Sequence, residues 1–243
     1  GFIDSVYPGR AMREDVNSGE KSGARVALLI QPSEQIAITP RIVYQKLETD
    51  GYPRVDVYNI LGNPFTTTEP PVNPGERGQV TQIREGIDDE LMLADLKMEF
   101  GLGGVTLTSV SSYTDRDLTV LRDASQLTGS VTLSLDDGRN IATSADVRLN
   151  SPQYDVTSLK SFSQELRLAS DGGGSFEWLV GAFYQDIDRD YGQNLPTPGY
   201  DAVLTRLGLP TVRHSVSALS RYKGRRCAAP SCNTKSMSWK RRN

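Results

Sequence analysis

The chain has 243 residues, of which 37% are hydrophobic and 23% charged, with a formal net charge of −3. That length can bury a sizeable core in one or two domains. No apolar run approaches the roughly 18 residues that a membrane helix requires, which excludes a helical membrane protein, whereas barrel strands need only about 10 residues of alternating character.

The first predicted strands cover Ala24–Gln31 and Ile36–Glu48, and only four residues separate them. One face of the second strand is apolar (Ile36, Ile38, Ile42, Tyr44) and the other is polar (Thr39, Arg41, Gln45). A period of two with unlike faces is typical of a β-strand that has one wet side. The pair is therefore predicted to form a hairpin.

Two further hairpins follow the same pattern. Strands are predicted at Glu90–Phe100 and Val105–Arg116, joined through Gly101–Gly104. In the third hairpin, alternating segments at Phe162–Leu168 and Phe176–Tyr184 flank a glycine-rich turn. Short turns of this composition favour antiparallel pairing.

Long connections separate the hairpins: Thr49–Asp88, Asp117–Lys160 and the stretch from Arg189 onward. The weak alternation at Ser130–Leu135 predicts a local strand inside the second of them. Several long loops are uncommon in a compact domain, whereas outer-membrane barrels alternate short turns with long loops. The predicted fold class is all-β, with antiparallel hairpins forming part of a transmembrane β-barrel; a soluble β-sandwich is the alternative.

Four sequence segments carry a family resemblance. They are GFID at Gly1–Asp4, GARVALLIQPSEQIAITP at Gly23–Pro40, LTSVSSYTDRD at Leu107–Asp117, and FSQELRLAS with FEWLVGAFYQD within Phe162–Asp186. Together they resemble the barrel of TonB-dependent outer-membrane receptors of proteobacteria, from Gly1 to about Pro210. The intact barrels of this family have about 22 strands.

The resemblance implies a receptor for energy-coupled uptake of a siderophore, cobalamin or carbohydrate across the outer membrane. A small-molecule ligand would meet the long loops on the extracellular side. The TonB energy-coupling protein would act through an N-terminal region, and no nucleic-acid partner is expected. Polar residues expected to line the lumen or contact a plug are Arg41, Gln45, Lys97, Glu165 and Arg167.

The chain also departs from the family pattern. The plug domain, the energy-coupling box and a signal peptide would all precede Gly1, and the six predicted strands are far fewer than the family's number. Open strand edges cannot be satisfied by lipid. Residues 1–212 are therefore expected to be a partial barrel, which alone would not close, insert or transport.

Residues 213–243 differ in composition from the rest, with nine basic residues and no acidic one. A frameshift is one hypothesis, because Pro230–Arg242 can be back-translated and read in another frame as ELQYKINELEAT, which is similar to the family's next strand. Its rival is a genuine basic tail that binds nucleic acid or anionic lipid.

No enzyme is predicted, and no catalytic, cofactor or metal residue is assigned. The single histidine, His214, rules out an HExxH motif, and with Cys227 and Cys232 it supplies too few ligands for a structural zinc site. Two minor motifs are SxxK at Ser220–Lys223 and a glycine turn at Gly172–Gly174. The acidic pairs Asp88-Asp89 and Asp136-Asp137 are expected in loops, where solvated charge is more typical than calcium binding.

Two alternative functions stay open at this stage. One is a soluble β-rich module, either a carbohydrate-binding domain or a hydrolase. The other is a passive porin, which would differ from a receptor in needing no plug.

Overall fold

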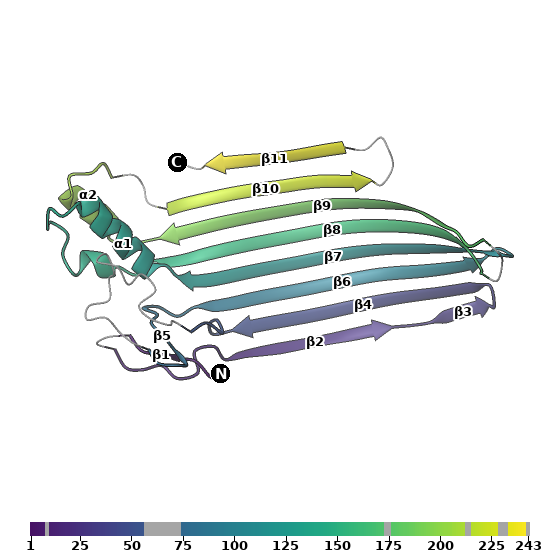
Figure 1. Ribbon diagram of the computed structural model, residues 1–243, viewed down its shortest axis with the longest axis horizontal. Coiled ribbons are helices and arrows are strands. Elements are labelled where there is room, and N and C mark those ends of the chain that lie inside the picture. The colour runs from purple at the N-terminus through teal and green to yellow at the C-terminus, as the bar shows by residue number, and fades with distance from the viewer. Residues whose placement is uncertain (8–9, 56–73, 173–175, 212–214, 228–232, 242–243) are drawn as a thin grey trace.

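One antiparallel sheet of nine strands dominates the molecule (Figure 1). The computed structural model describes residues 1–7, 10–55, 74–172, 176–211, 215–227 and 233–241, with side chains as far as residue 211. The strands of the sheet are β2 (Gly19–Ala27), β3 (Ile30–Ser33), β4 (Ile36–Thr49), β6 (Gly86–Gly101), β7 (Val105–Asp123), β8 (Pro152–Ser170), β9 (Leu179–Pro196), β10 (Ser215–Cys227) and β11 (Asn233–Arg241).

The order of the strands in space follows the order in sequence, from β2 and β4 through β6, β7, β8, β9 and β10 to β11, while β3 pairs with β4. Each strand thus pairs with its neighbours in the chain, as in successive hairpins. The three predicted hairpins are confirmed, and so is the all-β class at the level of an antiparallel sheet.

The two ends of the sheet differ. Short connections at 34–35, 102–104 and 171–178 lie at one end, which we call the turn end. At the opposite, loop end lie the helices α1 (Ser125–Asp136) and α2 (Tyr200–Arg206) and the short strands β1 (Asp4–Ser5) and β5 (Gly78–Gln79) (Figure 1). All longer connections among the described residues meet at the loop end.

The strands are longer than the sequence pattern predicts. Strand β7 continues to Asp123 rather than ending at Arg116, β8 begins at Pro152, and β9 runs to Pro196. The predicted connection Asp117–Lys160 is therefore largely wrong at its two ends. Ladder hydrogen bonds come from the backbone, so a strand persists where its side chains no longer alternate.

The local strand predicted at Ser130–Leu135 is wrong, because this segment belongs to α1. The buried side chains of α1 are small or polar (Ser125, Thr128, Gly129, Thr132, Asp136). Thr132 donates its hydroxyl to the carbonyl oxygen of Thr128 at 2.9 Å. A helix whose buried side is polar lacks the apolar period that marks an amphipathic helix in sequence.

Helix α2 supplies the apolar core at the loop end. The buried cluster is Tyr200, Val203, Leu204 and Leu207, with Ile141, Ala142, Leu149 and Leu209 packed against it. The 3-10 helix η1 (Asp146–Arg148) is tied to α2 by an ion pair of 2.6 Å between Arg206 and Asp146. The two long connections thus fold together into one lobe.

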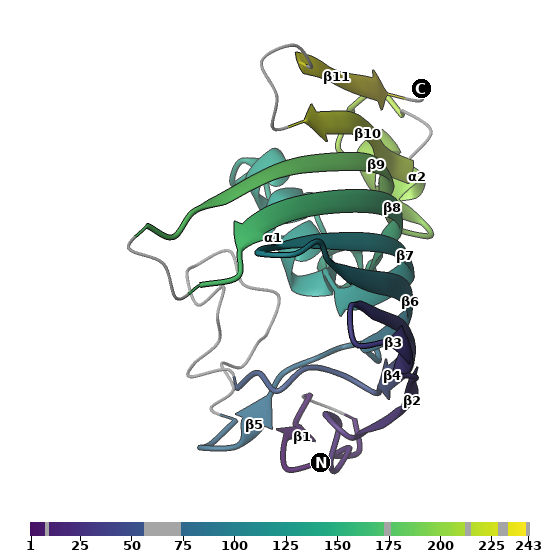
Figure 2. The ribbon, with the colours of Figure 1, turned by 90° about the vertical axis from the view of Figure 1, so that its right-hand side faces the viewer.

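The N-terminal segment forms a second small unit. Strands β1 and β5 pair in parallel, with Asp4 opposite Gly78, and Ile3 beside them is only 1% exposed. Figure 2 shows the large sheet as an arc, with β1, β5 and α1 on its hollow side. The N-terminal segment and two of the connections thus gather over one face of the sheet.

The predicted boundary at residues 212/213 does not coincide with an edge of the sheet. Strand β10 pairs with β9 from Ser215 opposite Pro196 to Cys227 opposite Tyr184. Both the frameshift and the basic tail remain hypotheses.

Within the described residues, none of the helices has the length and apolar character needed to cross a membrane.

Leu204→Ala should destabilise the helical lobe by about 2–4 kcal/mol, because it empties part of a closed core. The matched change Leu127→Ala on α1, where the side chain is 51% exposed, should cost no more than about 0.5 kcal/mol. Native-state hydrogen exchange of the α2 amides measures both. Equal protection in the two variants would contradict the assignment of the core.

Candidate functional site

The register of the sheet sorts side chains onto two unlike faces. On one, which we call the apolar face, large apolar side chains are 37–60% exposed: Val26, Ile42, Tyr44, Met92, Tyr113, Phe162, Leu166 and Val180. They occupy the part of each strand nearer the turn end, which we call the apolar band. An exposed apolar surface that runs across six strands marks a contact with lipid or another apolar partner.

The apolar band ends abruptly on every strand from β4 to β9. Its last side chains are Tyr44, Met92, Tyr113, Phe162 and Tyr184. The next side chains on the same face, two residues nearer the loop end, are Lys46, Glu90, Asp115, Lys160 and Asp186. A charge follows the band in each case, so the boundary is sharp on all five strands.

Aromatic rings mark this boundary. The rings of Phe162 and Tyr184 are 6.5 Å apart between centroids and tilted by 54°. The Tyr44 hydroxyl donates to the carboxylate of Glu90 at 3.1 Å, beyond the end of the band. A tyrosine with an apolar body and a polar tip suits a boundary between apolar and wet surroundings.

The boundary is staggered relative to the register. Tyr44 lies opposite Met92 and Tyr113 opposite Phe162, whereas the steps from β6 to β7 and from β8 to β9 each move the boundary two residues toward the turn end. The mean shift is one residue per strand. One residue spans about 3.4 Å along a strand, and neighbouring strands lie about 4.8 Å apart. The strands are therefore inclined by about 35° to the perpendicular of the line that joins the boundary residues.

The opposite face, which we call the polar face, carries charges and hydroxyls. All five residues predicted to line a lumen share it (Arg41, Gln45, Lys97, Glu165, Arg167). Arg41 pairs with Asp95 at 2.5 Å, and Arg116 holds Asp89 through two hydrogen bonds of 2.7 and 2.6 Å. These charges are therefore matched across neighbouring strands.

Asp155 joins three strands on the polar face near the loop end. Its carboxylate accepts hydrogen bonds from the Tyr191 hydroxyl at 2.9 Å and from Gln193 at 2.8 Å, and Arg122 lies 3.4 Å away. Asp155 is only 6% exposed. Each of these partners satisfies part of the buried carboxylate, which would otherwise be costly to keep charged.

A buried glutamate joins the loops to the sheet. Glu85 accepts a hydrogen bond from the backbone N–H of Asp123 at 2.9 Å and lies 3.3 Å from the guanidinium of Arg54. Asp123 in turn accepts from the backbone N–H of Ser125 at 2.9 Å. Burial raises the pKa of the Glu85 carboxyl above its ordinary value, more than its partners lower it.

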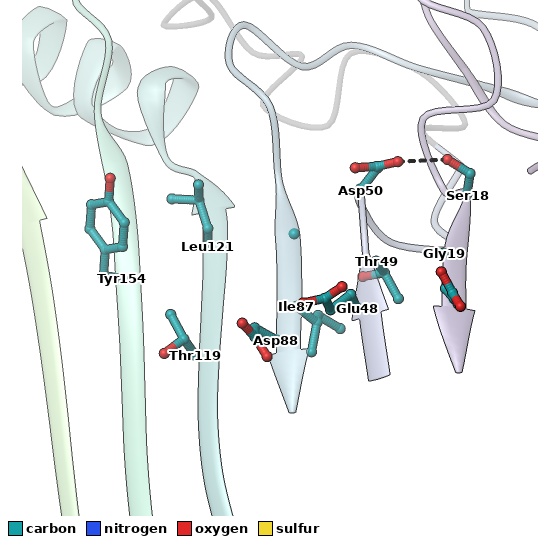
Figure 3. Close-up of a pocket in the computed structure, with 12 residues that line it drawn as sticks. Ser18, Gly19, Glu48, Thr49, Asp50, Ile87, Asp88, Thr119, Leu121 and Tyr154 are labelled. Carbon is teal, nitrogen blue, oxygen red and sulfur yellow. Dashed lines mark hydrogen bonds between the residues drawn. The ribbon is translucent and has the colours of Figure 1, made fainter. Parts of the chain in front are cut away.

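A cavity of about 670 Å³ opens among the loop-end portions of β2, β4, β6, β7 and β8 (Figure 3). Glu48, Asp50 and Asp88 line it, and the Ser18 hydroxyl donates to Asp50 at 2.8 Å. These acids disfavour an anionic occupant. In the part of the chain that the structure describes, no three His, Cys, Asp or Glu residues are arranged to hold a metal ion.

The minor motifs fall in separate places. The prediction that the acidic pairs are loop charges is wrong for Asp88 and Asp89, which belong to β6. Asp88 lines the cavity, whereas Asp89 lies on the polar face. Asp136, the last residue of α1, accepts a hydrogen bond from the backbone N–H of Ile141 at 3.0 Å, and Asp137 caps the helix with a left-handed backbone. His214, Cys232 and Gly173–Gly174 lie outside the described residues, as do the side chains of Ser220, Lys223 and Cys227.

Sequence reasoning found the two faces but missed the boundary of the apolar band. The signal was present, because Tyr44 and Tyr184 are each followed two residues later by a charge. The Asp155 and Glu85 clusters had no such signal, since their members lie far apart in sequence. Only the pairing of strands brings Asp155 beside Arg122 and Tyr191.

Comparison with models of known protein families gave no match, and comparison with curated proteins gave none either. Function is therefore inferred from the residues and their geometry.

The loop segment around Glu85 should lose stability as the pH rises. The pKa of the Glu85 carboxyl is raised in the folded state, so its contribution to the free energy of unfolding is complete below the ordinary glutamate pKa. That contribution is lost as the pH rises through the raised pKa. Hydrogen exchange of residues 78–86, corrected for intrinsic rates, measures this. Glu85→Gln should flatten the dependence, whereas Glu34→Gln, an exposed glutamate at the turn end, should leave it intact.

Proposed function

We propose that the chain is a part of the membrane-spanning barrel of an outer-membrane receptor of the TonB-dependent class. The apolar band would face lipid, and the polar face would line the lumen of a transmembrane β-barrel. The observation that carries this proposal is the staggered boundary. Its slope of about 35° is the tilt that strands of outer-membrane barrels adopt, roughly 35–45°.

The height of the apolar band supports the same proposal. Ile36–Tyr44, Met92–Phe100 and Val105–Tyr113 each cover nine residues. Membrane strands need about 9–11 residues. Nine residues span about 27 Å along a strand, or about 22 Å after the tilt, close to the apolar belt of about 25 Å in known barrels.

Exposed apolar side chains argue against a soluble module. Ile42, Leu166 and Val180 are 58%, 44% and 58% exposed on the apolar face. A water-soluble sheet would bury such a face against a second layer. In a bilayer the same side chains need no protein cover, because hydrocarbon provides the apolar surroundings.

In the proposed receptor, the loop end faces the outside and meets a small-molecule ligand, which would be a siderophore, cobalamin or carbohydrate. The matched charges of the polar face, such as Arg41 with Asp95, would line the wet interior or contact a plug. The TonB protein of the inner membrane would drive movement of that plug and so release the ligand inward.

Cysteine accessibility tests the orientation of the apolar face. When these strands are part of a complete barrel in outer membranes, Leu166→Cys should resist a charged, water-soluble thiol reagent, because it would lie in hydrocarbon. Lys160→Cys, six residues away on the same face but beyond the boundary, should react readily. Both should react after denaturation.

Equal and rapid labelling at positions 160 and 166 in intact membranes would overturn the proposal. Recovery of the complete, unmodified protein from the water-soluble fraction would overturn it as well, and would favour the soluble module.

A charge placed in the band should block assembly. Leu166→Arg should cost about 2–4 kcal/mol near the middle of the hydrocarbon, so the amount in the outer-membrane fraction should fall more than tenfold. Gln45→Arg, on the polar face, should assemble normally. The two levels are compared by immunoblot, and similar levels would contradict a lipid-facing Leu166.

A further inference from the structure

Four arginines gather at the loop end. Arg10 and Arg13 come from the N-terminal segment, Arg84 follows β5, and Arg148 ends η1. Arg10, Arg84 and Arg148 are exposed, while Arg13 is half-buried. We call this set the arginine cluster. Its members come from three separate segments, so the fold, and no single motif, produces it.

Gln82 holds the cluster together, because it is buried and bonded to three segments. Its side-chain oxygen accepts from the Tyr7 hydroxyl at 2.8 Å, and its side-chain nitrogen donates to the carbonyl oxygen of Arg148 at 2.7 Å. The guanidinium of Arg10 donates to the Gln82 carbonyl oxygen. The backbones that carry Arg10, Arg84 and Arg148 are thereby fixed relative to one another.

The arginines divide into two roles. Arg13 donates to the carbonyl oxygens of Thr81 and Ile83 at 3.0 and 3.3 Å and to the Ser5 hydroxyl at 3.1 Å, so it holds the lobe. Arg10 lies over the Tyr7 ring, 5.0 Å from its centroid. A guanidinium has five N–H donors, and those of Arg10 and Arg84 that face solvent can receive an anion.

The local charge is positive. Two acids, Asp123 and Glu85, interact electrostatically with Arg13. Two further positive charges, Arg10 and Arg84, do so as well, which makes three arginines against two acids. Both carboxylates are occupied by backbone N–H groups. Burial is the largest cause that lowers the pKa of Arg13, and the neighbouring guanidinium groups of Arg84 and Arg10 lower it further. A bound anion would relieve this repulsion.

We infer that the arginine cluster binds a small polyanion whose charge is carried by carboxylate or phosphate oxygens. Guanidinium groups match such oxygens with paired hydrogen bonds, and a second negative group can reach a second arginine. The cavity lined by Glu48, Asp50 and Asp88 has the opposite charge, so the two loop-end sites differ in preference. The idea that this anion is the transported ligand rests on the proposed function. The binding of the anion to the cluster does not depend on that function.

Calorimetric titration of the purified protein in detergent at low salt tests this site, with citrate and pyrophosphate as the two probes. At least one probe should bind, and Arg84→Gln should weaken it about tenfold or more, since a charge-assisted hydrogen bond is lost. Arg84→Lys, which keeps the charge, should weaken binding less. The better probe identifies carboxylate or phosphate as the preferred group.

Arg25→Gln is the matched control, because it removes one exposed arginine from edge strand β2 and leaves the cluster intact. It should bind like the unaltered protein. No binding of either probe, or equal loss in Arg25→Gln and Arg84→Gln, would overturn the site. The titration needs no membrane, so a protein that spans the membrane but binds neither probe would lose only this inference.

Discussion

The continuous antiparallel ladder from β2 to β11 is the constraint on which the rest of the structure depends. Backbone N–H and C=O groups must be paired, and the ladder pairs them strand by strand. Its register fixes which side chains share a face. A slip of one residue would carry Tyr44 to the polar face and Arg41 to the apolar face, so the contrast between the faces holds the register in turn.

Because the ladder does not depend on apolar side chains, it continues past the apolar band. Strands β7, β8 and β9 extend beyond Tyr113, Phe162 and Tyr184 and carry the connections away from the band. The loop-end lobe, the buried Glu85 and the arginine cluster all lie at the loop end, beyond the apolar band. The chain thus presents one apolar surface, the apolar band, and carries its polar clusters at the loop end.

The sequence predicted the hairpins well, because alternation in β4, β6 and β8 is strong where one face is apolar. It underestimated the strands beyond the band, where both faces are polar and alternation fades. It missed α1 because Ser125, Thr128 and Thr132, which this helix buries, are not apolar. The arginine cluster could not be predicted from the sequence, since Gln82 joins segments some 70 residues apart.

In the proposed receptor, the staggered boundary lies in the plane of a membrane surface. Polarised infrared spectroscopy of the complete barrel that contains these strands, in aligned bilayers, measures the mean tilt of the strands most directly. A tilt of about 35–45° from the bilayer normal is the predicted result. Strands that lie parallel to the bilayer plane, or a protein that stays in water and leaves the bilayers empty, would contradict the account.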